Sequence, residues 1–230
     1  IGRFSLDNVS VLSLNIGQPE DLLQSARMYA SAGVLSIETE KPHFENERNS
    51  AFRVQMRGGS FGYVSPSIRW WQKAGSRTSF SLNGNYMRAD GNYPFTLVNG
   101  KYVTEEKRNN SAIYTYQIEP TLFHTFKDSS NLELKAYYFY SKRGLPGSVT
   151  LYNPISDETL WDENVFIQTR YKKDFSQKWS LQAQAKYNHG WNKYEDKGNE
   201  YADGLYRAVH RQDEYLSLIH ISEPTRLRCI

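Results

Sequence analysis

The chain has 230 residues, a negative mean hydropathy and a formal net charge of +3. No uncharged run reaches the roughly 18–20 residues of a membrane-spanning helix, which excludes a helical membrane protein. The 17 tyrosines, 11 phenylalanines and 5 tryptophans exclude an unfolded polar chain, and the basic residues are too scattered for a nucleic-acid partner.

The first forty residues predict a small mixed α/β unit. The apolar residues of 9–14 predict a strand. Pro19 and Glu20 are typical of a helix start, with proline early and a carboxylate in the first turn. The apolar residues 34–37 predict a second strand, and the charged residues 43–50 form a connector.

From residue 51 onward, apolar and polar residues alternate, which is the pattern of a half-buried strand. Phe52, Val54 and Met56, for example, alternate with Arg53 and Gln55. We predict seven strands of about ten residues, near 51–57, 61–72, 78–88, 111–126, 131–141, 164–174 and 179–188. Pro66 and Pro120 fall inside two of these strands and count against them, because proline removes a ladder donor; a bulge near a barrel rim would accommodate them.

The connections between the strands alternate in length. Tight turns are expected at 73–77, 127–130 and 175–178, and long loops at 89–110, 142–163 and from 189 onward. This asymmetry is typical of a bacterial outer-membrane barrel, with tight periplasmic turns and longer extracellular loops. A soluble β-sandwich also alternates, but its strands usually have five or six residues.

Two further features favour a membrane barrel over a sandwich. Aromatic residues gather at the strand ends, as in the girdles at membrane interfaces; they include Trp70, Trp71, Tyr86, Tyr138, Tyr140, Trp179 and Tyr187. The apolar faces of the strands near 78–88, 131–141 and 179–188 carry no charge. We therefore expect an all-β fold, a partial transmembrane antiparallel β-barrel in contact with outer-membrane lipid.

Several segments resemble TonB-dependent outer-membrane receptors. The stretch 8–42, with Gly17-Gln18-Pro19-Glu20-Asp21, resembles the end of the plug domain of this family. Gly58-Gly59-Ser60-Phe61-Gly62 is similar to its first barrel hairpin, and Arg143-Gly144-Leu145-Pro146-Gly147 to an outer-loop segment of Bacteroidetes members. Within the family the cobalamin-receptor-like branch is most similar, and the resemblance covers about 1–215.

The resemblance implies a domain organisation and a function. Residues 1–42 would be the C-terminal part of the plug, 43–50 a connector, and 51–215 the N-terminal part of the barrel. The family implies energised uptake across the Gram-negative outer membrane of a scarce, large ligand such as cobalamin or an iron-siderophore. The family's TonB-contacting segment is missing from this sequence. We therefore expect a fragment that does not transport alone.

The end of the chain differs from the rest. Residues 216–226, Leu-Ser-Leu-Ile-His-Ile-Ser-Glu-Pro-Thr-Arg, resemble an in-frame translation of a transposon-type sequencing adapter. We expect 216–230 to be a non-native tail; a genuine strand followed by a polar tail is the alternative. The single cysteine, Cys229, lies in this tail.

Candidate ligand residues are the aromatic side chains of the expected outer loops, because exposed rings bring large contact area with little loss of entropy. They are Tyr93, Phe95, Tyr102, Tyr152, Trp161, Trp191 and Tyr194. The alternative is that these rings pack loop against loop or mark the outer girdle.

Charged residues of the polar strand face are the second candidate set. They are Arg53, Arg57, Arg69, Glu119, Lys135, Arg170 and Lys186. These side chains would contact the plug or an anionic ligand, or simply pair with one another in a polar lumen.

The sequence contains no recognisable catalytic or metal-binding motif. The histidines lack paired ligand spacing, and no Gly-x-Ser-x-Gly elbow frames a nucleophile. We therefore expect no enzyme, no cofactor and no metal site, although the carboxylates around Trp161 are of a type that also binds Ca²⁺. Two other functions stay open, an ungated outer-membrane porin and a soluble β-rich surface protein that binds glycans.

Overall fold

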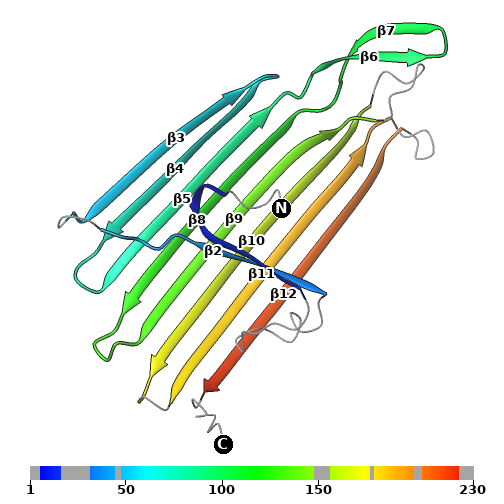
Figure 1. The fold of residues 1–230 in the computed structure, drawn as a ribbon. Helices are drawn as coiled ribbons and strands as arrows, with labels where there is room; N and C mark the ends of the chain where they lie inside the picture. The colour runs from blue at the N-terminus through cyan, green and yellow to red at the C-terminus, as the bar shows by residue number, and fades with distance from the viewer. Residues whose placement is uncertain are drawn as a thin grey trace, which may run out of the picture.

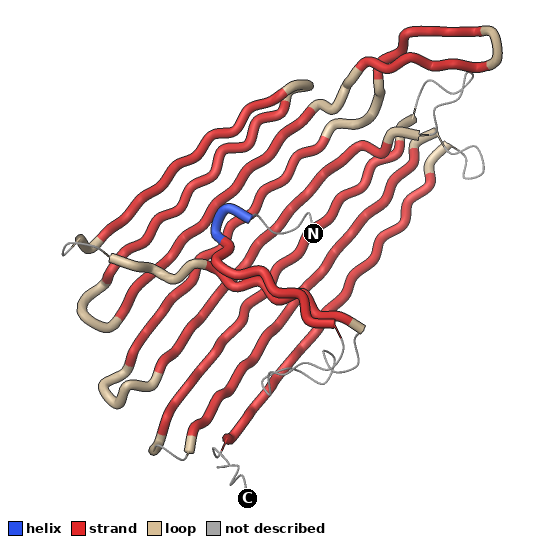
Figure 2. The backbone as a smooth tube through the Cα atoms, viewed as in Figure 1, coloured by secondary structure: helices blue, strands red, loops and turns tan. Residues whose placement is uncertain are grey.

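The computed structural model describes residues 6–16, 32–44, 48–147, 156–176, 179–198 and 204–222. In these ranges the chain is all-β, apart from a single 3-10 turn at Leu6–Asn8 (Figure 2). No helix of the described ranges is long and apolar enough to cross a membrane. The helix expected after Pro19 falls at 17–31, outside the described residues.

Eight antiparallel strands form one large sheet, in the order β12-β11-β10-β9-β8-β5-β4-β3 (Figure 1). Their bounds are β3 Ser50–Gly59, β4 Tyr63–Lys73, β5 Thr78–Ala89, β8 Ile113–Thr125, β9 Asn131–Leu145, β10 Glu158–Asp174, β11 Ser180–Asp196 and β12 Tyr206–Ser222. The described part of the sheet is open, with β3 and β12 at its edges. The predicted all-β class is confirmed.

Two smaller strand pairs complete the described fold. β1 (Val9–Ile16) pairs with β2 (Gly33–Thr39), and this pair lies across one face of the large sheet (Figure 1). β6 (Pro94–Asn99) and β7 (Tyr102–Lys107) form a hairpin that projects beyond one end of the sheet. β5 pairs directly with β8, so this hairpin is inserted in the chain between two neighbouring strands of the large sheet and is not part of that sheet.

Several strands are longer than the sequence predicts. β9 runs on to Leu145, β10 begins at Glu158 and β11 ends at Asp196, so much of the expected loops 142–163 and 189 onward is strand. β12 is an eighth strand, and it continues past residue 215 to Ser222. The extensions were missed because apolar and polar residues are mixed on both faces there, so hydrophobicity no longer alternates. The ladder, however, continues, as in the pairing of Asp162 with Asn192.

The two faces of the large sheet have opposite character. On β8, Tyr116 and Ile118 are 46% and 48% exposed, whereas the alternating residues Gln117 and Glu119 are 7% and 3% exposed. The pairing of neighbouring strands places the apolar residues on one face of the sheet. This apolar face includes Phe52, Val54, Ile68, Trp70, Leu82, Ile118, Leu134 and Ile167. The polar face includes Arg53, Arg69, Asn83, Gln117, Glu119 and Lys135. Many large apolar side chains of one face are thus exposed, whereas the buried residues of the other face are mostly polar, apart from the aromatic cluster of Tyr137, Phe139 and Phe166. A water-soluble core has the opposite arrangement.

Candidate functional site

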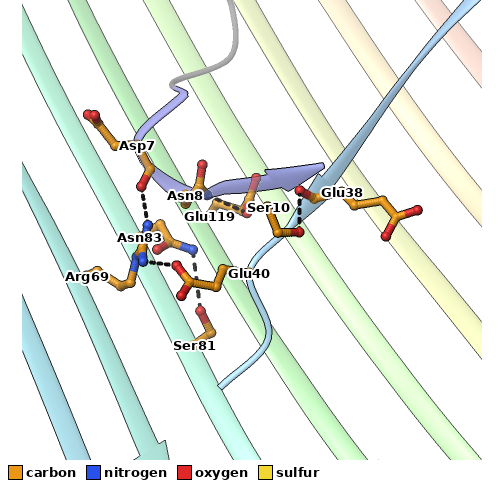
Figure 3. Close-up of polar contacts among 9 residues, drawn as sticks. All are labelled: Asp7, Asn8, Ser10, Glu38, Glu40, Arg69, Ser81, Asn83 and Glu119. Carbon is orange, nitrogen blue, oxygen red and sulfur yellow. Dashed lines mark hydrogen bonds and ion pairs between the residues drawn. The ribbon is translucent and has the colours of Figure 1, made fainter. Parts of the chain in front are cut away.

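The candidate site lies on the polar face, under the N-terminal strand pair. Ladder pairing aligns Arg53, Arg69, Asn83 and Glu119 in one row across β3, β4, β5 and β8. Their side chains point to the same face because alternate residues of a strand do so. We call residues 6–16 and 32–44 the N-terminal unit; its contacts to this row define the site (Figure 3).

Arg69 forms the centre of these contacts. Its guanidinium donates to the carboxylate of Glu40 and to the backbone oxygen of Asp7, and its side chain is only 9% exposed. The neighbouring Arg57 pairs with the Asp7 carboxylate, with Nη1 and Oδ2 3.1 Å apart. Asp7 precedes β1 and Glu40 follows β2. Because the two strands are antiparallel, both residues lie at the same end of the pair, and this end of the unit is tied to the sheet (Figure 3).

A second group of contacts surrounds the buried carboxylate of Glu119. Asn8 Nδ2 donates to Glu119 Oε1 over 3.0 Å, and Lys135 Nζ lies 3.5 Å from the same oxygen. Lys135 also donates to Thr39 Oγ1, over 2.8 Å. The charge of Glu119 is therefore compensated by a cation that itself holds the N-terminal unit. A buried carboxylate without such partners would be costly.

A small cavity lies beside these contacts. Its lining is polar and includes Asp7, Arg53, Gln55, Asn83 and Gln117. Asn83 Nδ2 donates to Ser81 Oγ over 3.3 Å, whereas Asn83 Oδ1 is buried and has no hydrogen-bond partner among the described residues. A polar pocket with such an acceptor is suited to a bound water.

The seven charged residues predicted for this face have different surroundings in the structure. Arg57, Arg69, Glu119 and Lys135 contact the N-terminal unit. Lys186 lies elsewhere, with its ammonium 4.2 Å from the ring centroid of Phe166. Arg53 lines the small cavity, and Arg170 pairs in register with Glu133 and Gln184. Contact with the N-terminal unit and charge pairing within the sheet therefore both occur.

The predicted ligand residues fall into two groups rather than one, and Tyr152 lies outside the described residues. The first group belongs to the β6–β7 hairpin. The ring of Tyr93 lies 6.3 Å from that of Phe95 and 6.2 Å from that of Phe61. Tyr102 is 73% exposed at the hairpin tip. Among the six candidate residues that the structure describes, this group is the one that lies beyond the end of the large sheet.

The second group lies in strands, not in loops as expected. Trp161 belongs to β10, and Trp191 and Tyr194 belong to β11. Trp161 is flanked by the ammonium groups of Lys193 and Lys142, at 3.9 and 5.6 Å from its ring centroid. The expected loop placement of these three residues is wrong because the strands extend further than the hydrophobic pattern does. Among the described residues no group of three potential metal ligands forms.

Sequence reasoning missed the partners supplied by the N-terminal unit: Asp7, Asn8, Thr39 and Glu40. These residues lie 29 to 111 positions from the residues that they contact, as for Arg69 with Glu40 and Asn8 with Glu119. No local pattern links residues so far apart. The only available signal was that polar residues flank both strands of the unit.

Comparison with protein families and with curated proteins identifies no relative of this chain. The chain matches no protein-family model, and a search of curated proteins finds no similar sequence.

Proposed function

We propose that the chain forms part of the wall and plug of a TonB-dependent outer-membrane receptor. Its role is energised uptake of a scarce, large ligand. In this proposal the large sheet is a segment of a barrel wall in the Gram-negative outer membrane. The N-terminal unit is the part of the plug that closes the pore, and the TonB energy-transducing complex acts through a segment preceding it.

The inverted polarity of the sheet supports the membrane assignment. Exposed apolar side chains such as Val54 and Ile118 would contact lipid, and the polar face would line the lumen. A soluble sandwich would instead turn the apolar residues of its sheet inward.

The polar contacts between the N-terminal unit and the large sheet support the gating part of the proposal. Arg69, Glu119 and Lys135 hold the unit by hydrogen bonds and ion pairs. Water can replace such contacts when a plug moves, because exchange of a hydrogen bond to a charged group with solvent changes the net free energy by about 1.5–3 kcal/mol. The attachment is therefore suited to a unit that must be displaced.

We place ligand capture at the loop end of the sheet. The exposed rings of Tyr93 and Tyr102, with the half-buried ring of Phe95 beside them, would provide contact area for a large compound. A cobalamin-like compound is our first choice and an iron-siderophore the second, and this choice follows from the resemblance alone.

Removal of the N-terminal unit tests the gate. We expect deletion of residues 1–42 from the intact protein to raise single-channel conductance in planar bilayers, because a polar lumen would be opened. Deletion of the β6–β7 hairpin, residues 94–107, is the control and should leave the closed state unchanged. Equal conductance with and without residues 1–42 would favour the ungated porin. A protein that stays soluble without detergent would favour the glycan-binding alternative and overturn both membrane assignments.

A further inference from the structure

A second cavity lies at the opposite end of the sheet from the long loops, and none of the functions considered above uses it. It has a volume of about 570 Å³, and its lining consists of Arg77, His124, Phe126, Lys127, Asp128, Ser130 and Tyr171. These residues come from the turn before β5, from the end of β8 and the turn that follows it, and from β10. We call this cavity the turn-side pocket.

Aromatic rings form one side of the turn-side pocket. The ring of Phe126 packs edge-on against His124 at 4.6 Å and against Tyr171 at 6.4 Å. His124 is fixed from the other side, because its Nδ1 lies 2.8 Å from Thr78 Oγ1. His124 pairs in register with Leu132, so these rings continue the apolar face. The pocket thus lies where the apolar face meets the turns.

The charges of the turn-side pocket are unbalanced. Its single carboxylate, Asp128, is 2.8 Å from Lys173 Nζ and accepts two further hydrogen bonds from Ser130, from Oγ at 2.7 Å and from the backbone N–H at 3.1 Å. Asp128 is therefore neutralised by a residue outside the lining. The cations of the lining, Arg77 and Lys127, are both exposed and face solvent. The pocket is accordingly suited to an anion with an apolar neighbour.

We propose that the turn-side pocket binds the phosphate of an anionic glycerophospholipid. The assignment rests on the proposed membrane function, because it needs the apolar face to lie in a bilayer. Arg77 and Lys127 would pair with the phosphate, and guanidinium groups bind phosphate through two parallel hydrogen bonds. Phe126 and Tyr171 would contact the glycerol and the first acyl carbons. A free phosphate would use only the cations and leave the rings without a role.

Lipid retention by the full 230-residue chain tests this proposal. The chain is inserted into bilayer nanodiscs of phosphatidylcholine and phosphatidylglycerol in equal amounts, extracted with a mild detergent, and its retained lipids are counted by native mass spectrometry. We expect the wild type to retain phosphatidylglycerol in preference to phosphatidylcholine. Arg77→Gln with Lys127→Gln should lower that preference about tenfold, which corresponds to ~1.4 kcal/mol.

A variant with the same loss of charge is the matched control. Lys101→Gln with Lys107→Gln removes two exposed cations from the β6–β7 hairpin at the other end of the sheet, and it should retain lipid as the wild type does. Equal retention by both double variants, or no preference in the wild type, would overturn the proposal. Displacement of the retained lipid by millimolar inorganic phosphate would assign the pocket to free phosphate instead. Failure of the wild type to enter the nanodiscs would count against the membrane function itself.

Discussion

At the scale of single residues, Arg69 should decide how firmly the N-terminal unit is held. Arg69→Gln removes the pair with Glu40 and weakens the bond to the Asp7 backbone. Glu40 is 44% exposed, so solvent screening limits the cost, and we expect about 1–2 kcal/mol. Faster hydrogen exchange of the β1 and β2 amides would report the loosened unit.

Arg53 provides the control for this substitution. It lies in the same row of the same face, in register with Arg69, but it is exposed and lines only the small cavity. Arg53→Gln should leave the exchange of β1 and β2 unchanged. If the two variants accelerate exchange equally, then loss of positive charge, and not the Arg69 contacts, loosens the unit.

The turn that carries Asp128 should show a pH dependence. The pKa of the Asp128 carboxyl lies below its ordinary value of 3.8, chiefly because Lys173 donates a hydrogen bond to it and then because Ser130 does. A carboxyl with a lowered pKa stabilises the fold above its ordinary pKa, and this contribution is lost as the pH falls through the lowered value. Between pH 5 and pH 2, the Tm of the wild type in detergent should therefore fall more than that of Asp128→Asn. Parallel pH profiles would show that Asp128 contributes nothing to the difference.

At this scale the sequence predicted which residues share the polar face but not which of them find partners on the N-terminal unit. Strict alternation assigned Arg57, Arg69, Glu119 and Lys135 to one face, and the register agrees. The partners Asp7 and Asn8 depend on where the unit docks on the sheet. Docking is a property of the folded surface and leaves no period in the sequence.

At the scale of elements, one asparagine bridges the adjoining ends of β9 and β10. Asn110 Nδ2 donates to the backbone oxygens of Leu145 and Glu158, over 3.1 and 2.6 Å. Asn110 adopts a positive φ of 50°, a conformation that asparagine tolerates better than most residues. The loop after the β6–β7 hairpin is thereby fastened to two strand ends.

Gly144 leaves room for Asn110 to make these hydrogen bonds, and Gly144→Ala should disrupt them. A Cβ at residue 144 would collide with the backbone and side-chain oxygens of Asn110, and a backbone atom cannot swing away. We expect limited proteolysis to cut the segment 108–112 faster in this variant. Gly58→Ala is the control, because the nearest atom to its Cβ would be 3.9 Å away. Equal resistance of the two variants would mean that the loop does not depend on this junction.

The boundaries of the strands were predicted less well from the sequence than their central parts. The apolar cores of β5, β8 and β11 were located by their alternation, but the ends of β9, β10 and β11 were not. Pro66 and Pro120 lie within strands β4 and β8 without a bulge. Each proline instead leaves a gap in one ladder, without a change of register on either side of the gap. Its missing N–H removes a bond, and the remaining ladder is sufficient to keep the strands aligned.

At the scale of the whole molecule, two consecutive tryptophans test which face meets lipid. Trp70 is 40% exposed on the apolar face, whereas Trp71 belongs to the polar face, 5.6 Å from the Arg69 guanidinium. In vesicles with brominated acyl chains, a variant that keeps only Trp70 should be strongly quenched, and one that keeps only Trp71 should not. Equal quenching of the two would contradict the proposed orientation of the sheet, and quenching of neither would place it outside the bilayer.

The large-scale arrangement was predictable only in part. Alternation and turn spacing gave an antiparallel sheet with short connections at one end and long ones at the other, and the strand order agrees with this. The hairpin of β6 and β7 was not foreseen, because its alternation is short and β7 is exposed along its whole length. The placement of β1 and β2 across the sheet was likewise beyond any local signal.

The distance along the chain between Asn8 and Glu119 has a consequence for the order of folding. In the large sheet each strand pairs with its neighbour in sequence, except that β5 pairs with β8 across the 90–112 excursion. Such a sheet can grow hairpin by hairpin, since contacts between near neighbours close short loops. The bond from Asn8 spans 111 residues and has to wait until β8 is in place. The part of the N-terminal unit that is synthesised first is therefore among the last to become fixed.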